Sequence, residues 1–290
     1  MKVLLIVNPQ SGVRSSKNQL VNALAVFSKH KYNVEVYTTQ SQGDAYNYLK
    51  RNKKHYDIVC CAGGDGTVNE VTNALMTKKD KPLLGYFPSG TMNDFGSNFD
   101  LGNDWGDIAE RICAGKYKEF DLGLFEKRYF NYVAAFGAMT DVPYSTKRNI
   151  KEAFGNFAYF MEGISKLNEV HPVKVKVTID GKTRTYNTLF GLVFSGGRVA
   201  GTELVSKNKS NVNDGKFNIM LVDYVETPIP WVPDLLRTVA EQKKHIHWFN
   251  TSEVTLEFED RLDWTLDGEK ASCDKRVTIK NINKALRMLS

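Results

Sequence analysis

The stretch from Tyr56 to Met76 constrains the fold of this chain more than any other. It reads YDIVCCAGGDGTVNEVTNALM and has three successive parts. Tyr56 to Ala62 is a short apolar run, typical of a strand that is buried on both faces. Three glycines then surround Asp65, and apolar residues recur beyond them at helical spacing. The pattern predicts a strand, a tight turn and a helix.

The glycine turn has the properties of an anion site. Unpaired N–H groups and the helix dipole point at whatever lies before a helix N-terminus, and glycines let the backbone approach a phosphate closely. Thr67 is placed to accept hydrogen bonds from the first N–H groups of the helix. Asp65 would repel phosphates unless a cation lay between them, so it predicts Mg²⁺. The alternative is a plain turn in which Asp65 acts only as a cap.

Two common glycine-loop motifs fit the turn only in part. A Walker A loop needs a Gly-Lys-Ser/Thr ending, and this turn holds no lysine. A dinucleotide-binding fingerprint needs a third glycine where Asn69 stands, and no acid clearly takes the ribose-binding part.

Four segments together resemble the signatures of the diacylglycerol kinase catalytic-domain family, which includes soluble bacterial lipid kinases and the sphingosine kinases. They are Gly63–Thr67 with Asn69 and Glu70, then Pro88–Phe95, Asn8–Gly12 and Leu266–Glu269. Their order and positions fit the family across essentially the whole chain. The GGDGT run alone is also shared with NAD kinases and phosphofructokinases.

The resemblance implies ATP and Mg²⁺ as cofactors, with nucleotide contacts from the first three segments and from Thr39. The residues so assigned are Asn8, Pro9, Gln10, Ser11, Gly12, Thr39, Gly63, Gly64, Asp65, Gly66, Thr67, Asn69, Glu70, Gly90, Thr91, Asn93 and Asp94. These loops follow predicted strands, and ligands of open parallel sheets lie at that edge. The alternatives are a plain loop after Val7 and simple turn caps at Asn93 and Asp94.

Phosphoryl transfer also needs a base for the attacking hydroxyl. Asp267 resembles the catalytic aspartate of the family, and Glu269 is close enough in sequence to share or take that function. Asp65 completes the predicted catalytic acids by helping to hold the cation. Without the resemblance, Asp267 and Gly268 would be interpreted as an ordinary hairpin turn.

A second acidic turn lies at residues 211–216. In the family a structural Mg²⁺ is bound here, which implies the Asp214 carboxylate and the carbonyls of Asn211 and Lys216 as its ligands. The alternative is a simple Asp-Gly turn. The sequence departs from the family in two respects: no proline stands in the preceding run Val205–Lys209, and Asn213 replaces a common aspartate.

The chain of 290 residues is long enough for about two domains. Residues 1–121 alternate strands and helices, which predicts an α/β nucleotide-binding domain with a parallel, doubly wound sheet. The predicted strands there are Val3–Val7, Asn33–Thr38, Tyr56–Ala62 and Pro82–Phe87, and the further helices are Lys17–His30, Gly43–Lys50 and Asp107–Gly115. The resemblance to the NAD kinase and diacylglycerol kinase fold implies that residues 283–290 return to this domain.

Residues 122–282 alternate polar and apolar positions with period two, which predicts a mostly antiparallel, sandwich-like β domain with inserted helices. Asp180-Gly181 is a hairpin signal, because a type I′ turn needs positive φ. The predicted strands are Val173–Ile179, Lys182–Tyr186, Leu189–Phe194, Phe217–Val222, Val254–Phe258, Arg261–Leu266 and Val277–Ile282. A cleft between the two domains is the expected place for a site.

Two helices are predicted within the β domain. Ile150–Leu167 has an apolar face that suits packing on the sandwich, and its aromatic flank could instead line an entrance for acyl chains. Trp231–Phe249 is the second stretch. It carries Lys243 and Lys244 beside Trp248, a combination that could press on an anionic membrane or merely offset the helix dipole.

The composition indicates which kinds of partner and which cellular compartment suit the protein. The net charge of +6 favours an anionic partner such as ATP or an acidic headgroup, and no arginine-rich tract indicates nucleic acid. The four cysteines show no CxxC pair, which predicts reduced thiols and a cytoplasmic protein. The N-terminal apolar run of five residues is too short for a signal peptide. A homodimer is compatible with the sequence, which leaves the oligomeric state open.

The sequence therefore predicts an ATP- and Mg²⁺-dependent kinase acting on the hydroxyl of a membrane lipid, with diacylglycerol as the first choice and peripheral contact with the inner face of the membrane. One rival is another small-molecule kinase such as an NAD kinase. The other is a lipid- or nucleotide-binding protein without catalytic activity.

Overall fold

The structure is a computed structural model that describes residues 1–11, 16–137, 171–199, 201–205, 211–224 and 245–290. It divides into two compact units, one of residues 1–122 with 283–290 and one of residues 123–282. The sequence placed this boundary at Asp121. Strands β5 (Tyr117–Phe125) and β17 (Arg276–Leu289) carry the chain from one unit to the other. The first predicted insertion, Ile150–Leu167, lies outside the described residues.

Unit 1 is built on a parallel sheet with the strand order β2-β1-β3-β4. The strands are β1 (Lys2–Val7), β2 (Asn33–Thr38), β3 (Ile58–Gly63) and β4 (Leu83–Pro88), and the end of β17 adds to β4 in parallel. Every residue of β3 is buried, which explains its unbroken apolar sequence. On β2, exposed and partly buried positions are interspersed. The predicted parallel, doubly wound sheet is confirmed.

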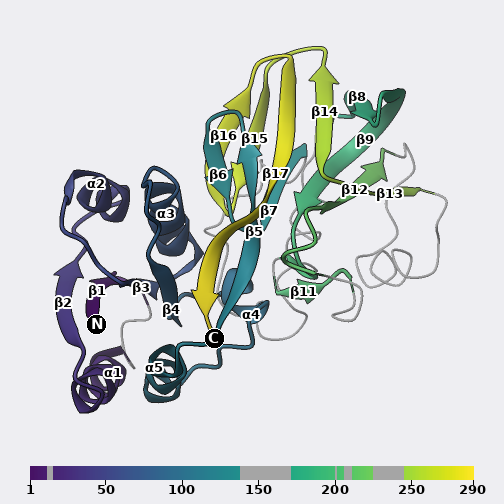
Figure 1. Ribbon diagram of the computed structural model, residues 1–290. Coiled ribbons are helices and arrows are strands. Elements are labelled where there is room, and N and C mark those ends of the chain that lie inside the picture. Colours follow the sequence, from purple (N-terminus) through teal and green to yellow (C-terminus); the bar gives the residue numbers. More distant parts are fainter. Residues whose placement is uncertain (12–15, 138–170, 200, 206–210, 225–244) are drawn as a thin grey trace. The chain divides into compact units, whose positions relative to one another are not determined.

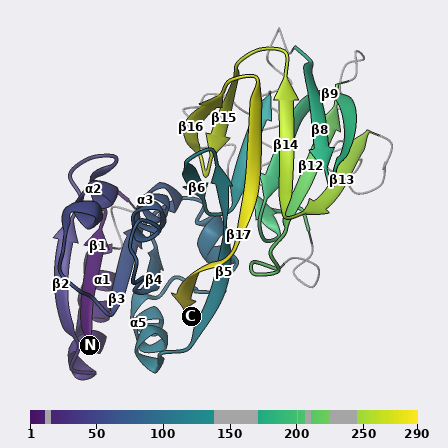
Figure 2. The ribbon, with the colours of Figure 1, turned by 45° about the horizontal axis from the view of Figure 1, so that its top comes forward.

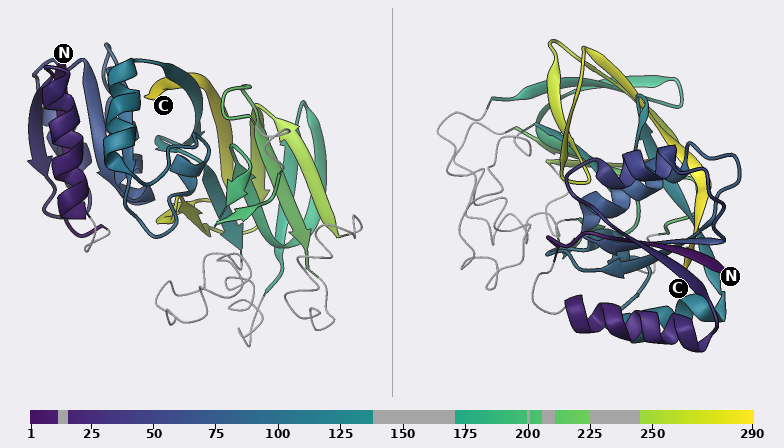
Figure 3. Two further views of the ribbon diagram at one scale, coloured as in Figure 1. Left: turned by 90° about the horizontal axis from the view of Figure 1, so that it is seen from below. Right: turned by 90° about the vertical axis from the view of Figure 1, so that its left-hand side faces the viewer.

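Helices cover both faces of this sheet. Helices α1 (Ser16–Lys29) and α5 (Trp105–Ala114) lie side by side on one face, and α2 (Asp44–Arg51) and α3 (Asp65–Leu75) on the other (Figures 1 and 3). Asp104 caps α5 by accepting the N–H of Asp107, and Gly115 ends the helix with φ 74°. A short helix that the sequence analysis missed, α4 (Asp94–Ser97), follows β4.

The strand order places a topological switch point between β1 and β3. From β1 the chain moves outward to β2, then returns to the other side of β1 to form β3 and β4. The loops that follow β1 and β3 therefore diverge to opposite faces of the sheet. Ligands of doubly wound sheets bind at this point, at the carboxyl ends of the strands.

Unit 2 consists mainly of antiparallel strands that curl around a common core (Figure 2). The first half of β9 (Lys182–Phe194) pairs with β8 (Val173–Ile179), and its second half lies between β7 (Val133–Gly137) and β12 (Phe217–Asp223). The remaining strands are β6 (Arg128–Phe130), β10 (Arg198–Val199), β11 (Thr202–Glu203), β13 (Ile246–Thr251), β14 (Glu253–Phe258), β15 (Leu262–Leu266) and β16 (Glu269–Cys273).

The core of unit 2 is centred on aromatic side chains. The ring of Trp264 lies 4.8 Å from that of Phe136 and 5.0 Å from that of Phe125, measured between centroids. The Asp180-Gly181 hairpin is confirmed, with φ values of 49° and 73°. The two strands predicted at Lys182–Tyr186 and Leu189–Phe194 are one continuous strand, β9.

The predicted helix Trp231–Phe249 is wrong at its end. Residues 246–251 form strand β13, which pairs with β12, and residues 225–244 lie outside the described part of the chain. Ile246, Trp248 and Phe249 are residue types that favour strands, and the pairing with β12 overrides the helical interpretation. Trp248 is 42% exposed on this strand. Among the described residues, no helix combines the length and the apolar character needed to cross a bilayer.

The returning strand generates a testable prediction. The buried carboxylate of Asp121 accepts the main-chain N–H of Lys284 at 2.7 Å, where β17 enters unit 1. Replacing Asp121 by alanine leaves that donor without its acceptor and is expected to lower the free energy of unfolding by about 1–3 kcal/mol. Urea unfolding measures the loss.

Lys284→Ala is the matched control, because it keeps the main-chain N–H and removes only the exposed ion pair of Lys284 with Glu119. Its expected effect is within about 0.5 kcal/mol. Equal stability of the Asp121→Ala and Lys284→Ala proteins would contradict this function of Asp121.

Candidate functional site

The glycine turn joins β3 to α3 as predicted, but the helix begins earlier than expected. Asp65 is the first helical residue, and Gly64 precedes it without a side-chain cap. Thr67, predicted to cap the helix, instead lies inside its first turn and is buried. Its hydroxyl oxygen accepts a hydrogen bond from Asn8 Nδ2 at 3.0 Å. Thr67 therefore ties α3 to the loop after β1.

Asn8 holds the loop after β1 through several hydrogen bonds, one of which its carbonyl accepts from the N–H of Ser11 at 3.2 Å. Its main-chain N–H donates to the carbonyl of Ala62 at 2.8 Å, and its Oδ1 accepts the N–H of Gln10 at 3.0 Å. Its side-chain amide makes the bond to Thr67. Pro9 and Gln10 are exposed at the tip of the loop, and Gly12 lies outside the described residues.

The glycine turn and the loop after β4 meet backbone to backbone. A Cβ added to Gly90 would lie 2.7 Å from the Cα of Gly64, and a Cβ on Gly64 would lie 3.2 Å from the Cα of Gly90. Real Cβ atoms essentially never approach within 3.0 Å, so only glycine fits at position 90. The N–H of Ser89 donates to the carbonyl of Gly63 at 3.0 Å, and the hydroxyl of Ser89 donates to that of Ser11 at 3.1 Å.

The loop after β4 is closed by Asn93. Its Oδ1 accepts the N–H of Gly90 at 2.8 Å, and its Nδ2 donates to the carbonyl of the same residue at 2.9 Å. Asn93 has φ 50°, a conformation that asparagine tolerates better than most residues. Thr91 is exposed beside it.

Sequence analysis missed Tyr86, which connects the same two loops. Its hydroxyl donates to the carbonyl of Gly63 at 3.2 Å and lies 3.5 Å from Asn93 Oδ1. Burial raises the pKa of Tyr86 well above its usual value, so the hydroxyl stays protonated and can donate. A buried tyrosine inside an apolar strand gives no sequence signal for this function.

Asp65 acts as a hydrogen-bond acceptor for the loop after β4. Its Oδ2 accepts the N–H of Asp94 at 3.3 Å, and its Oδ1 accepts the N–H of Phe95 at 3.2 Å. These groups open helix α4, whose preceding residue, Asn93, makes no side-chain cap. Asp65 is partly exposed, whereas Asp94 is 1% exposed. Asp65 thus acts as a cap, and the helix that it caps is α4 and not its own helix.

The loop after β2 is held by Glu70, which also lies on α3. The carboxylate of Glu70 accepts main-chain N–H groups at the start of α2, from Gly43 at 2.7 Å and from Ala45 at 3.0 Å. Thr39 is buried at the end of β2, and its N–H donates to the carbonyl of Val7 at 2.9 Å. Asn69 is also buried, and its Oδ1 accepts Asn73 Nδ2 at 3.1 Å.

In unit 2, Asp267 and Gly268 form the two-residue turn between β15 and β16, with φ 49° and 88°. The carboxylate of Asp267 is buried, 4% exposed, and accepts three successive main-chain N–H groups, those of Asn131, Tyr132 and Val133, at 2.5 to 3.1 Å. Glu269 begins β16 and is partly exposed. The structure thus brings both predicted acids to one turn and fixes the orientation of Asp267.

The second predicted metal site forms a tight turn. Asp214 Oδ1 accepts the N–H of Lys216 at 3.0 Å, and Gly215 has φ 76°. Asn211 lies at the start of this segment, and residues 206–210 before it are outside the described part. Across the described ranges, no group of three or more His, Cys, Asp or Glu side chains is arranged to hold a metal ion. A cation at either predicted site would need carbonyl, water or phosphate oxygens as further ligands.

Comparison with known proteins gives the family. Residues 2–125 match the diacylglycerol kinase catalytic domain, and residues 135–290 match the YegS C-terminal NAD kinase beta sandwich-like domain. A Staphylococcus saprophyticus protein named diacylglycerol kinase is 30% identical over 268 residues, which cover 91% of this chain and 88% of that protein. The chain belongs to the diacylglycerol kinase family. It is therefore a kinase of the diacylglycerol kinase type, and the predicted fold class is confirmed for both domains.

Other members of the diacylglycerol kinase family agree. A protein of the same name from Staphylococcus aureus strain bovine RF122 / ET3-1 is 34% identical over 220 residues, covering 76% of this chain and 70% of its own. Two solved structures of Bacillus anthracis str. Sterne proteins share the fold. One has a TM-score of 0.83 at 22% identity and the other 0.77 at 21%. Both matches cover 99% of this chain. They cover 94% of the first solved chain and 96% of the second.

The contacts of Asp65 lead to a prediction about the kinase. An asparagine at position 65 keeps one acceptor oxygen, so either Asp94 or Phe95 loses the acceptor for its N–H group. We expect Asp65→Asn to lower the free energy of unfolding by about 1–2 kcal/mol and to speed amide exchange at Asp94 and Phe95. Asp104→Asn is the control, because asparagine caps a helix as well as aspartate does. Unchanged exchange at both amides would show that Asp65 does not hold this loop.

Proposed function

We propose that the protein is an ATP- and Mg²⁺-dependent lipid kinase that phosphorylates the hydroxyl of diacylglycerol to give phosphatidic acid. The observation that carries the proposal is the contact between Gly64 and Gly90, in the loops after β3 and β4 at the carboxyl edge of a parallel sheet. Two glycine backbones with no side chains between them leave main-chain groups as the surface that a polyphosphate would meet. The names of the relatives support the choice of lipid.

The residues of unit 1 are suited to the phosphates of ATP. Helix α3 directs its first N–H groups towards the turn at Gly64, and the helix dipole favours an anion there. Ser11 and Ser89 add hydroxyls at the same edge. The carboxylate of Asp65 is partly exposed and supplies the hard oxygen that Mg²⁺ prefers. When bound, Mg²⁺ would neutralise the charge that develops on the phosphate oxygens.

The acidic turn of unit 2 is proposed to supply the base for the lipid hydroxyl. Asp267 is the residue that the resemblance indicates, and its three N–H contacts fix the direction of its carboxylate. Glu269 is the partly exposed acid beside it. A base that is fixed in position before the substrate arrives loses little entropy on reaction.

The lipid substrate implies contact with a membrane surface. The net charge of +6 and the exposed Trp248 on β13 both suit the interface of an anionic bilayer. We propose peripheral association with the inner face of the membrane, in a cytoplasmic protein. Trp248→Ala is expected to weaken pelleting with anionic liposomes. Pelleting of the variant equal to that of the wild-type protein would show that Trp248 does not contribute to membrane binding.

The proposed activity is tested by transfer of radiolabelled phosphate from ATP to a lipid panel in mixed micelles, with NAD as an additional acceptor. We expect labelled phosphatidic acid that depends on Mg²⁺ and is lost on chelation with EDTA. Labelling of NAD instead would favour the NAD kinase alternative. No transfer to any acceptor would favour a binding protein without catalytic activity.

The two acids of unit 2 are distinguished by separate variants. We expect Asp267→Asn and Glu269→Gln each to lower kcat by roughly 10²- to 10⁴-fold if it acts as the base. Asp267→Asn should in addition lower the unfolding free energy by about 1–3 kcal/mol, because its three N–H donors lose an acceptor oxygen. Glu269→Gln should leave stability unchanged. Near-normal turnover in both folded variants would contradict the assignment of the base to this turn.

A further inference from the structure

The carboxylate of Glu70 points at the start of a neighbouring helix. Its Oε1 accepts the N–H of Gly43 at 2.7 Å, and its Oε2 accepts the N–H of Ala45 at 3.0 Å. Each carboxylate oxygen therefore holds one main-chain donor of the first turn of α2. The contact joins two helices on the same face of the unit 1 sheet (Figure 1).

Helix α2 depends on this outside acceptor because it lacks a cap of its own. Its N-cap residue is Gly43, with φ 82° and no side chain that could accept an N–H. The acid of its first turn, Asp44, is turned back towards β2. Its carboxylate accepts the N–H of Gln40 at 2.8 Å and the hydroxyl of Tyr37 at 3.0 Å. The first N–H groups of a helix have no intrahelical partner, so Glu70 satisfies two of them.

The segment between β2 and α2 is thereby fixed at both ends. Asp44 holds Gln40 at its start, and Glu70 holds Gly43 and Ala45 at its end. Thr39, at the end of β2, is anchored to the carbonyl of Val7 on β1. The segment begins at the carboxyl edge of the sheet, as do the loops after β1, β3 and β4.

We propose that Glu70 is a positioning residue that acts through the β2–α2 segment and does not touch the nucleotide. The inference rests on the proposed ATP-dependent function. A carboxylate aimed at a triphosphate would repel it, whereas this one is compensated by two N–H groups and the positive end of the α2 dipole. Glu70 presents the segment that contains Thr39 to the nucleotide in one conformation, which lowers the entropy lost on binding.

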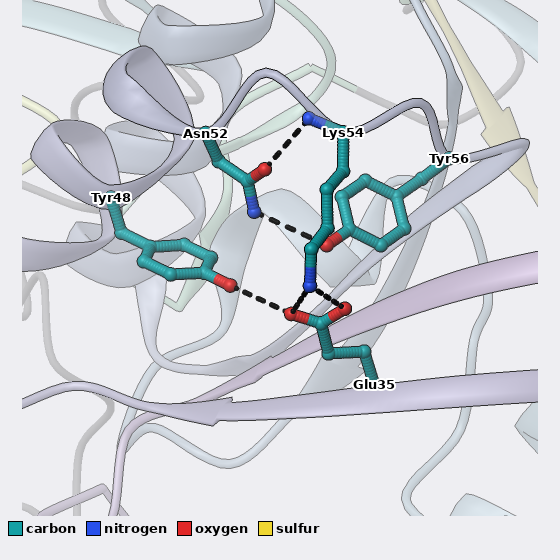
Figure 4. A network of polar contacts seen from close by, with 5 residues as sticks. All are labelled: Glu35, Tyr48, Asn52, Lys54 and Tyr56. Atoms are coloured by element: carbon teal, nitrogen blue, oxygen red, sulfur yellow. Dashed lines mark hydrogen bonds and ion pairs between the residues drawn. The ribbon is translucent and has the colours of Figure 1, made fainter.

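Glu35 offers a matched control in the same unit. It lies on β2 within a separate polar network, in which its carboxylate accepts Lys54 Nζ at 2.9 and 3.1 Å and the hydroxyl of Tyr48 at 3.1 Å (Figure 4). The bond to Lys54 lowers the pKa of Glu35, and burial together with the bond to Glu35 raises the pKa of Tyr48 to about 12. Tyr48 lies in the second turn of α2, and the N–H groups of Gly43 and Ala45 keep Glu70 as their acceptor. Glu35→Gln thus removes the same charge as Glu70→Gln without altering the two contacts under test.

The experiment compares Glu70→Ala, Glu70→Gln and Glu35→Gln in the full chain, by amide exchange over residues 40–46 and by steady-state kinetics with ATP. We expect Glu70→Ala to speed exchange at Gly43 and Ala45 by about tenfold or more and to raise KM for ATP by roughly three- to tenfold. The effect on kcat should be smaller. Glu70→Gln keeps one acceptor oxygen and should lie between wild type and Glu70→Ala, while Glu35→Gln should change neither quantity by more than about twofold.

Two results would overturn the proposal. Unchanged exchange at Gly43 and Ala45 in Glu70→Ala would show that Glu70 does not hold the segment. Faster exchange with an unchanged KM for ATP would reduce Glu70 to a structural residue. If the wild-type protein turns over no ATP, the proposed function fails and the nucleotide role of Glu70 fails with it. The exchange measurement then still decides whether Glu70 holds the start of α2.

Discussion

Three polar side chains on helix α3 hold the loops at the carboxyl edge of the unit 1 sheet. Asp65 binds the loop after β4, Thr67 the loop after β1 and Glu70 the segment after β2. The helix itself follows the fully buried strand β3, which lies between β1 and β4, so the three contacts start from an element in the interior of the sheet. A site for phosphates requires that loops from several strands keep fixed positions together, and one helix provides this.

Three acids of the predicted site bind main-chain N–H groups through their carboxylates. Asp65 and Glu70 each accept two main-chain N–H groups, and Asp267 in unit 2 accepts three. Hydrogen bonds from N–H groups to a carboxylate are stronger than neutral ones and spread its negative charge. Acidic side chains can therefore order the backbone of an enzyme for an anionic substrate without presenting their full charge to it. The same contacts hold Asp267 in the orientation proposed for the reaction.

The sequence predicted the elements whose patterns are local. The unbroken apolar run of β3, the alternation in β8 and the Asp180-Gly181 turn each depend on neighbouring residues alone. Strand β7 was missed because three of its five residues are alanine or glycine, which are depleted in strands. Strand β13 was mistaken for a helix because its pairing with β12 is non-local. The sequence indicated the motif residues of the predicted site, but it did not indicate the partners of Thr67 and Glu70. Those partners lie 59 and 25 to 27 residues away in the chain, so the fold alone brings them together.

We infer that α3 orders the three loops before the nucleotide arrives. A crystal structure with Mg²⁺ and a non-hydrolysable ATP analogue tests it most directly. We expect phosphates against Gly64 and Gly90, with the contacts of Asp65, Thr67 and Glu70 to their loops retained as in the free protein. A nucleotide bound elsewhere, or bound here only after these contacts have broken, would contradict it.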